Sequence, residues 1–473
     1  MATLPHLHAS TRTVVYKYAS FLYNDKLIKL LIVVIIATFI MVSLNSYKNT
    51  VCKTVDSIGP RLMEISDWLY ENPEYGCEEF EASKLLSNEL EKNEFKIDKP
   101  FLGMPTSFKA SYRGKPGGPR IAILGEYDAL EGIGHGCGHN IIGTAAIGAG
   151  IALSKVMKKF NGEVVVLGCP AEENRKGGPP GGWPCQSSKS IMCAKGVFDD
   201  IDVAMMVHPS SGLTLLNKGT LVGQYIDVVF KGKTAHAAGN PWEGRNAMQA
   251  AVLFINGINA MRQQFRRGKP YSPVTHWIIT EAGTAGNVIP DLAKVYGGIR
   301  SQDQTYLKEL FEMVKNCAKG AALMTGTEEE ITLRPGGGLH HQVGSEGMAS
   351  MASNLYLTEL MFNNFQTLGV ELEDWRITAR SEPGGGTDFS NVTRRVPGLH
   401  PHISISKRPI AGHSVELAKA TTTDDGHKAL LNGAKAMVMT AVDIFVNPKH
   451  VDRMKSVHLM DIDEYLVACS QFK

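Results

Sequence analysis

Short apolar runs alternate with helical stretches in the first large unit of the chain. Residues 121–124, 164–167 and 202–207 form apolar runs of strand length, and residues 141–158 carry the apolar pattern of a helix. This alternation is typical of a mixed, mostly parallel sheet flanked by helices, in which ligands bind at the carboxyl ends of the strands. We therefore predict an α/β catalytic domain whose site lies where these runs end.

A second pattern begins near residue 219. Strand-like runs and helical stretches follow one another in the order β-α-β-β-α-β, which predicts an inserted ferredoxin-like α+β domain. The expected elements are residues 225–230, 245–265, 274–281, 294–300, 304–325 and 328–333. The predicted boundaries are 51–218 for the first part of the catalytic domain, 219–334 for the insertion and 335–473 for the second part.

The amino-terminal region has a third pattern. Residues 30–44 are nearly all apolar, and residues 27–28 extend the run to roughly the 17–25 residues that cross a bilayer. We predict a transmembrane helix or signal anchor at residues 27–46, after an amino-terminal segment at 1–26. The basic residues before the apolar run at residues 30–44 are Arg12, Lys17, Lys26 and Lys29. They favour a cytoplasmic amino terminus and a lumenal or extracellular catalytic domain. The alternatives are a cleaved signal peptide and a buried helix of a soluble cytoplasmic enzyme.

Composition narrows the function classes. The chain has 473 residues, of which 43% are hydrophobic and 20% charged, and a net charge of +2. These values are ordinary for a globular protein of two or three domains. No dense Lys/Arg block and no phosphate-binding Gly-Lys loop occur, so we expect neither a nucleic-acid partner nor nucleotide chemistry. The eight cysteines include no CxxC pair, which excludes zinc-finger spacing.

Candidate metal ligands follow the predicted strands. Cys137 and His139 lie in a Gly-His-Gly-Cys-Gly-His-Asn motif, Glu172 and Glu173 follow the run at 164–167, and His208 follows the run at 202–207. A thiol, imidazoles and carboxylates at strand ends can hold divalent metal and activate water. Two adjacent carboxylates allow one to bind metal while the other acts as a base.

The remaining histidines cannot be ranked by spacing. His413 and His236 are candidates, and competing candidates are His340, His341, His400 and His402. Nothing in the residue pattern decides which of these side chains converge on the site.

Several motifs resemble the amidohydrolase branch of the aminoacylase and carboxypeptidase metallopeptidases. They lie at residues 72–79, 125–130, 134–140, 170–173, 232–247, 286–290, 386–389 and 396–401, so the resemblance covers roughly residues 55–445. Together these motifs are highly specific. Within the branch, residues 241–244 and 387–401 look most like animal β-alanyl-lysine dipeptidases.

The resemblance implies a centre of two divalent metal ions per subunit, with zinc preferred and manganese or cobalt as alternatives. By motif position, Cys137 would bridge the metals and Glu172 would be the general base and acid. The other implied ligands are His139, Glu173, His208 and His413. Asp128 would orient a ligand from behind, whereas Glu126 stands where the peptidase branch has a ligand histidine and is not expected to bind metal.

The resemblance also assigns the inserted domain as a lid and dimerisation domain, so we expect a homodimer. His236, Asn287 and Arg300 would bind substrate from this lid, and Arg300 suits a carboxylate because its guanidinium can contact both oxygens. The stretch at residues 176–190 is longer and richer in Gly and Pro than in most relatives.

We therefore predict a metal-dependent amidohydrolase or dipeptidase. It would cleave the amide bond of a dipeptide or N-acyl amino acid with a free carboxylate, with β-alanyl-lysine-type dipeptides as the first choice. The alternatives are a broad N-acyl-amino-acid hydrolase and a non-catalytic binding ectodomain with the same fold.

Overall fold

The computed structural model describes residues 25–173, 187–334 and 348–470, with side chains from residue 42 onward. Its centre is a six-stranded sheet in the order β1-β2-β4-β3-β5-β13. Strands β4, β3, β5 and β13 are parallel, whereas β1 and β2 run antiparallel at one edge. The bounds are β1 Lys96–Asp98, β2 Phe108–Arg113, β3 Lys115–Glu126, β4 Asn161–Cys169, β5 Val203–Met205 and β13 Gly398–Leu399. The predicted mixed, mostly parallel sheet is confirmed.

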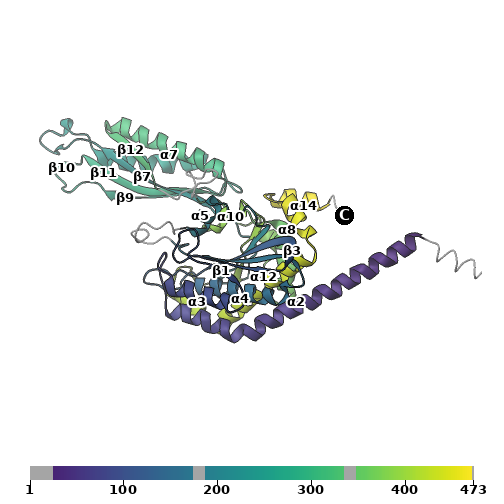
Figure 1. Ribbon diagram of the computed structural model, residues 1–473. Helices are drawn as coiled ribbons and strands as arrows, with labels where there is room; N and C mark the ends of the chain where they lie inside the picture. The colour runs from purple at the N-terminus through teal and green to yellow at the C-terminus, as the bar shows by residue number, and fades with distance from the viewer. Residues whose placement is uncertain (1–24, 174–186, 335–347, 471–473) are drawn as a thin grey trace, which may run out of the picture.

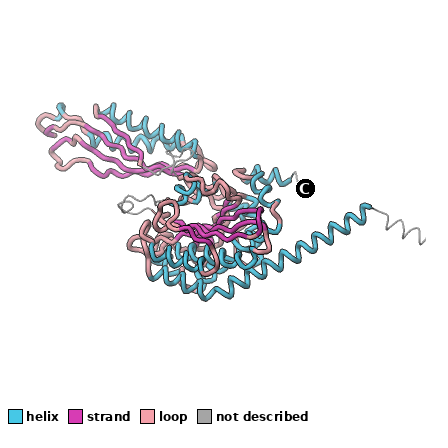
Figure 2. The backbone as a smooth tube through the Cα atoms, viewed as in Figure 1, coloured by secondary structure: helices cyan, strands magenta, loops and turns pink. Residues whose placement is uncertain are grey.

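Helices cover both faces of this sheet. On one face α2 (Asp25–Glu71), α3 (Phe80–Glu91), α4 (His139–Met157) and α12 (Asp424–Val446) pack into the largest apolar core. On the other face α5 (Ser188–Ala194) and α10 (Phe389–Thr393) enclose a smaller core. Figure 2 shows the strands between these layers. Strands β3 and β4 therefore end between two packed layers, and this position shields their carboxyl ends.

The inserted unit is a ferredoxin-like lid. Its four-stranded antiparallel sheet has the order β12-β7-β11-β9, with α6 and α7 packed on one face around a separate apolar core. The bounds are β7 Val222–Lys231, α6 Ala247–Met261, β9 Val274–Glu281, β11 Leu292–Ser301, α7 Gln304–Thr325 and β12 Glu328–Leu333. This order confirms the predicted β-α-β-β-α-β arrangement. Figure 1 shows the lid extending from the catalytic unit.

Shorter elements complete the fold. The strand pairs are β6 (His208–Ser210) with β14 (His402–Ser404), and β8 (Ala235–His236) with β10 (Val288–Ile289). The remaining helices are η2 Pro241–Glu243, η3 Arg262–Gln264, α8 Leu355–Thr367, α9 Trp375–Thr378, α11 Val415–Ala420, α13 Lys449–Ser456 and α14 Ile462–Ser470.

Helix α2 joins the predicted anchor to the first core helix without a break. Its carboxyl-terminal part buries Val51, Val55, Leu62, Ile65 and Leu69 in the catalytic core, and its amino-terminal part projects away from the fold (Figure 1). The side chains of residues 25–41, which hold most of the predicted span, lie outside the described residues. Among the described residues two helices, α4 and α12, are long and apolar enough to cross a membrane, but both are mostly buried inside the fold. Their apolar composition is explained by their position in the core of the catalytic unit.

Candidate metal centre

A thiol and two imidazoles meet where β3 ends and α4 begins. Cys137 lies in the loop before α4, and His139 is the first residue of that helix. The Sγ atom of Cys137 lies 3.3 Å from Nε2 of His208, and the His139 and His208 rings stand edge to face with centroids 6.1 Å apart. Because His208 follows β5, the site draws on neighbouring strands of the central sheet.

Among four groups of potential ligand atoms in the described residues, two share Cys137 and a third joins His139 to Glu172 and Glu173. Cys137, His139 and His208 form one group, and Cys137, Glu173 and His413 form the other; within each group the ligand atoms lie within 4.8 Å of one another. Because only Cys137 belongs to both, the arrangement suits two metal ions with a thiolate between them.

Hydrogen bonds fix which nitrogen each histidine turns toward the site. Asp128 Oδ1 lies 2.8 Å from Nδ1 of His139, and Nδ1 of His208 lies 2.8 Å from the carbonyl oxygen of Pro209. With Nδ1 donating in both rings, each Nε2 keeps a lone pair for a metal. The Nε2 atom of His139 is buried and makes no hydrogen bond among the described residues. Asp128 also accepts from the backbone N–H of Glu173 at 2.9 Å, so one carboxylate aligns two candidate ligands.

Two glycines of the 134–140 motif make room for the distant histidines. A Cβ on Gly136 would lie 3.1 Å from the carbonyl oxygen of Ser414, and the Gly136 carbonyl accepts from the backbone N–H of His413 at 3.0 Å. Gly138 has a φ of 77°, and a Cβ there would collide with the ring of Pro209. Residues with a Cβ are strained at that φ. The motif therefore needs glycine at these positions so that the segments carrying His413 and His208 can approach Cys137.

The charges around the site decide which candidate ligands hold a proton before metal binds. Burial opposes ionisation of Cys137, but His208 and His139 outweigh it and lower the pKa of the thiol to about 6. Hydrogen bonds to Cys137 and Glu173 raise the pKa of His413 to about 10, and His413 Nε2 lies 3.0 Å from Glu173 Oε1. A thiolate is the form that binds metal, whereas the raised pKa of His413 means that a metal must displace a proton from this ring.

Glu172 has a different environment from its neighbour. Burial, together with Glu126, Asp388 and Glu173, raises the pKa of Glu172 well above its usual value. For Glu173, burial acts in the same direction, but contact with His413 outweighs it and lowers the pKa. Two adjacent carboxyl groups with opposite shifts can divide the roles of proton acceptor and ligand.

Known proteins share this architecture. Residues 222–323 match the family model described as a peptidase dimerisation domain. The chain is 32% identical over 431 residues to the human Xaa-Arg dipeptidase, covering 87% of this chain and 91% of that protein. The chain belongs to the M20 family of metallopeptidases. It is also 36% identical over 290 residues to a p-aminobenzoyl-glutamate hydrolase protein of Escherichia coli, covering 57% of each chain.

A solved structure of an M20 peptidase from Bacillus subtilis, described as binding a dinuclear metal centre, has the same fold. It superposes with a TM-score of 0.61 at 20% identity, over 82% of this chain and 99% of that chain. Membership confirms the prediction of a metal-dependent hydrolase that acts on amide C–N bonds.

The M20 lid does not bring its three predicted substrate groups together within one chain. His236 and Asn287 lie together, since β8 pairs with β10 and the Ala237 N–H donates to the Asn287 carbonyl. Arg300 lies at the other end of β11, where its Nη2 donates to the hydroxyl of Tyr225 at 3.0 Å. Eight residues of strand separate Leu292 from Arg300, or about 26 Å at about 3.3 Å per residue. Asn287 and Arg300 of a single chain therefore cannot hold the same carboxylate, because a straight antiparallel strand keeps them apart.

The histidines that competed with His413 as possible metal ligands lie partly inside and partly outside the described residues. His400 and His402 lie beside His208, with ring centroids at 5.3 Å and 5.4 Å, but neither belongs to a group of potential ligands in the described chain. Burial holds the pKa of His402 down to about 3, so its ring stays neutral. His340 and His341 lie outside the described residues.

Sequence reasoning missed the role of Glu79. This buried carboxylate accepts from the backbone N–H of Ala171 at 2.8 Å and from the Thr106 hydroxyl at 2.9 Å. Ala171 has a φ of 53°, which is unfavourable for a residue with a Cβ. Glu79 thus secures a strained residue directly before Glu172. Its position in the motif at 72–79 was visible, but nothing in one sequence indicates a contact 92 residues away.

Sequence reasoning also missed Lys189, a buried lysine in the second half of the Gly- and Pro-rich stretch. Residues 174–186 of that stretch lie outside the described residues. Lys189 itself is described, and its Nζ lies 2.7 Å from Glu126 and 2.5 Å from Asp388. A lysine beside serines has no sequence signal for burial.

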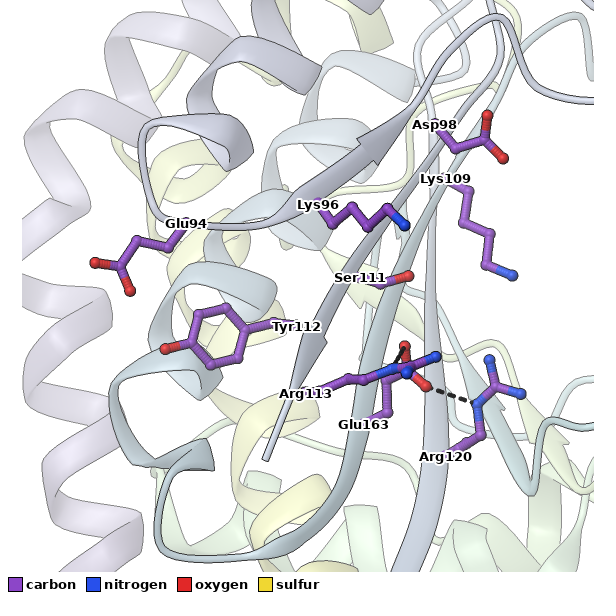
Figure 3. A pocket seen from close by; sticks show the side chains of 9 residues that line it. All are labelled: Glu94, Lys96, Asp98, Lys109, Ser111, Tyr112, Arg113, Arg120 and Glu163. Atoms are coloured by element: carbon purple, nitrogen blue, oxygen red, sulfur yellow. Dashed lines mark hydrogen bonds and ion pairs between the residues drawn. The ribbon is translucent and has the colours of Figure 1, made fainter. Parts of the chain in front are cut away.

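A cavity of about 530 Å³ lies elsewhere, on the outer surface of β1 and β2 (Figure 3). It is lined by Glu94, Lys96, Asp98, Lys109, Ser111, Tyr112, Arg113, Arg120 and Glu163. Glu163 stands at the start of β4, whereas the candidate ligands follow the end of that strand. The cavity is therefore separate from the metal centre.

Proposed function

We propose that this M20 enzyme is a dinuclear-metal dipeptidase that releases a C-terminal amino acid with a basic side chain. The observation that supports this most is the pair of three-residue ligand groups sharing Cys137, with the carboxylate of Glu172 beside them. The preference for a basic residue is supported by the relative named Xaa-Arg dipeptidase, whose length the chain covers almost fully.

Two divalent ions would be held by Cys137, His139, His208, Glu173 and His413, with Cys137 common to both groups of ligands. The donor set fits, since a thiol of lowered pKa and imidazoles whose Nε2 atoms face the other candidate ligands are suited to zinc. Zinc is preferred, with manganese and cobalt as alternatives. When bound, the ions would supply Lewis acidity that polarises the scissile carbonyl and acidifies water.

Glu172 carries the protons. Its raised pKa suits a group that accepts a proton from the attacking water and then returns it to the leaving amine. The backbone N–H of Glu173 donates to Asp128, which fixes the backbone of the proposed ligand Glu173. The side chain of Glu172 remains available for proton transfer. General acid–base catalysis of this kind typically contributes about 10²–10⁴-fold to the rate.

Substrate recognition requires two subunits in this proposal. Arg300 lies about 26 Å along β11 from Leu292, the end of the strand near His236 and Asn287. These groups can therefore bind one substrate only if they come from different chains. A homodimer formed through the lid would satisfy this, with one subunit's Arg300 and the other's His236 and Asn287 at each site. A symmetric dimer gives two equivalent sites of this kind.

We also propose that the amino-terminal part of α2 anchors the enzyme in a membrane, with the catalytic unit in the lumen or outside. Cys77 is disulfide-bonded, which fits an oxidising compartment. Tyr47 packs on Phe160 with ring centroids 4.8 Å apart, just before β4 begins. The candidate metal ligands follow the other end of β4, about 26 Å away at about 3.3 Å per residue. The candidate metal centre and the end of the anchor therefore lie at opposite ends of β4.

The test is hydrolysis of a dipeptide panel by the full-length protein in detergent, with elemental analysis of its metals. We expect Xaa-Arg and Xaa-Lys dipeptides, including β-alanyl-lysine, to be cleaved faster than acidic or apolar C-terminal analogues. Faster hydrolysis of N-acetyl or aromatic N-acyl amino acids would favour the broader hydrolase, which the similarity to the bacterial p-aminobenzoyl-glutamate enzyme supports. No hydrolysis by protein carrying two metals would contradict both.

A further inference from the structure

Lys189 is a completely buried cation at the start of α5. Its side chain is 0% exposed, and lysine is rarely buried in this way unless it is paired. Its Nζ lies 2.7 Å from Glu126 Oε1 and 2.5 Å from Asp388 Oδ1. Its backbone N–H also donates to the other oxygen of Asp388 at 2.9 Å. The lysine therefore joins the end of β3 to the start of α10.

The two carboxylates that Lys189 joins lie directly behind the proposed base. One oxygen each from Glu126, Asp388 and Glu172 lie within 4.8 Å of one another. Glu126 also reaches the metal side, because its Oε2 lies 3.3 Å from Nε2 of His139. A single ammonium group is thus surrounded by three carboxylates, two of which it contacts.

This arrangement constrains where Glu172 can sit. Carboxylates this close repel one another strongly away from bulk water. The ammonium group holds Glu126 and Asp388 in place through short charge-assisted contacts. With both neighbours fixed and partly neutralised, the carboxylate of Glu172 has a defined position beside them. If the ammonium were removed, the remaining charges would push Glu172 away from its position.

We propose that Lys189 is a positioning residue that holds the carboxylate of Glu172 in its reactive place through Glu126 and Asp388. This inference rests on the proposed function, in which Glu172 is the base. Lys189 cannot touch substrate because it is wholly enclosed, so its effect is on turnover rather than on substrate binding.

A merely structural role is the competing explanation, and Lys48 provides a matched control. Its Nζ lies 2.7 Å from Asp443 Oδ1 and 2.8 Å from Asn364 Oδ1, at the junction of α2 with the catalytic core. Both lysines join separate elements through an aspartate that is mostly buried, but only Lys189 lies beside the base. Loss of Lys48 should lower stability and leave turnover unchanged.

The experiment compares Lys189→Met, Asp388→Asn, the double variant and Lys48→Met in the full-length enzyme. For Lys189→Met we expect kcat to fall about 10- to 100-fold, as for a misplaced catalytic group, with KM and bound metal unchanged. The double variant removes one charge of each sign, so it restores the wild-type charge balance and should recover most of the lost kcat. Lys48→Met should keep wild-type kcat at temperatures where it remains folded.

Three results would overturn the inference: equal kcat for Lys189→Met and wild type, equal losses for Lys189→Met and Lys48→Met, or a double variant no faster than Lys189→Met. If Lys189→Met does not fold, the double variant is compared with Asp388→Asn instead. A kcat of the double variant far below that of Asp388→Asn would contradict charge compensation. Crystal structures of wild type and the double and single variants give a readout apart from activity. An unmoved Glu172 carboxylate in Lys189→Met would refute positioning, even if the wild type cleaved no dipeptide and the proposed function failed.

Discussion

The metal centre and the lid gather their functional residues in opposite ways. The centre brings Cys137, Glu173, His208 and His413 together from segments separated by up to 276 residues. These segments are fixed by buried strand ends, by two glycines and by the carboxylate of Asp128. In the lid, by contrast, His236 lies in the short β8–β10 pair that precedes β11, whereas Arg300 lies near the far end of β11. We infer that the chemistry is complete within one chain, whereas substrate recognition needs a second chain.

The largest expected effect is that of Glu172→Gln, which tests the proposed base of the metal centre. The amide cannot accept the proton, so we expect kcat to fall about 10²–10⁴-fold. Metal content should stay at the wild-type level, because the candidate ligands are other residues. Steady-state kinetics with elemental analysis measures both. Near-normal turnover with full metal content would remove Glu172 as the base.

A subunit-mixing experiment tests whether recognition is shared. Arg300→Ala alone should weaken kcat/KM for the free-acid dipeptide about 10- to 150-fold, since bonds to charged groups contribute about 1.5–3 kcal/mol. The C-terminally amidated dipeptide should be affected little. Arg334→Ala is the matched control, because this second arginine on the same lid sheet pairs with Asp227.

When the impaired Arg300→Ala and His236→Ala chains are unfolded, mixed and refolded together, activity should rise to about a quarter of wild type. Half of randomly paired dimers are mixed, and each mixed dimer has one intact site. If both residues served a site within their own chain, mixing would recover nothing.

The sequence predicted the secondary-structure elements better than the tertiary contacts between them. Apolar runs identified β3, β4 and β5 but not β1, β2 or β13 of the catalytic sheet, whereas β9, α7 and β12 of the lid have the predicted bounds. Periodicity is a local property, so it is readable residue by residue. By periodicity alone, His413 could not be separated from His402, because convergence depends on tertiary packing. The resemblance supplied that choice, and the structure brings His413 to Cys137.

The charges behind the base could not be predicted. Lys189 follows Ser187 and Ser188, and its burial depends on carboxylates contributed by β3 and by the start of α10. The distance in space between Asn287 and Arg300 could not be predicted either, since a separation of 13 positions in sequence does not fix how far apart two residues lie. Because most of these positions lie in an extended β-strand, Asn287 and Arg300 are far apart, whereas a loop could have kept their side chains close.

The pH dependence of metal binding tests the electrostatics of the centre. The thiol of Cys137 has a pKa lowered to about 6, so the thiolate is present above that pH and is lost as pH falls through it. The affinity of the metal-free protein for metal should fall about tenfold per unit below about pH 10, where the metal must displace a proton from His413, and more steeply below about pH 6, where a proton also competes for the sulfur. Isothermal titration calorimetry at pH 5, 6 and 7.5 measures this. Equal affinities across that range would contradict a thiolate ligand.

The smallest expected effect tests whether the lid is energetically separate from the centre. Asp303 caps α7 by accepting from the backbone N–H of Tyr306 at 2.7 Å, and Tyr306 lies in the lid's own core. Asp303→Ala should lower lid stability by about 1 kcal/mol, the usual cost of losing such a cap. Because the lid and catalytic cores are separate clusters, metal content and the unfolding of the catalytic unit should not change.

Thr423→Ala is the reciprocal change, since Thr423 caps α12 in the catalytic unit by accepting from the Gly426 N–H at 3.2 Å. It should destabilise α12 by a similar amount and spare the lid. Hydrogen exchange followed by peptide mapping reports the two units separately, because local opening raises exchange only where protection is lost. If Asp303→Ala also raised exchange in α4 and α12, the two cores would unfold as one unit. The lid would then influence the metal centre through stability as well as through substrate contacts.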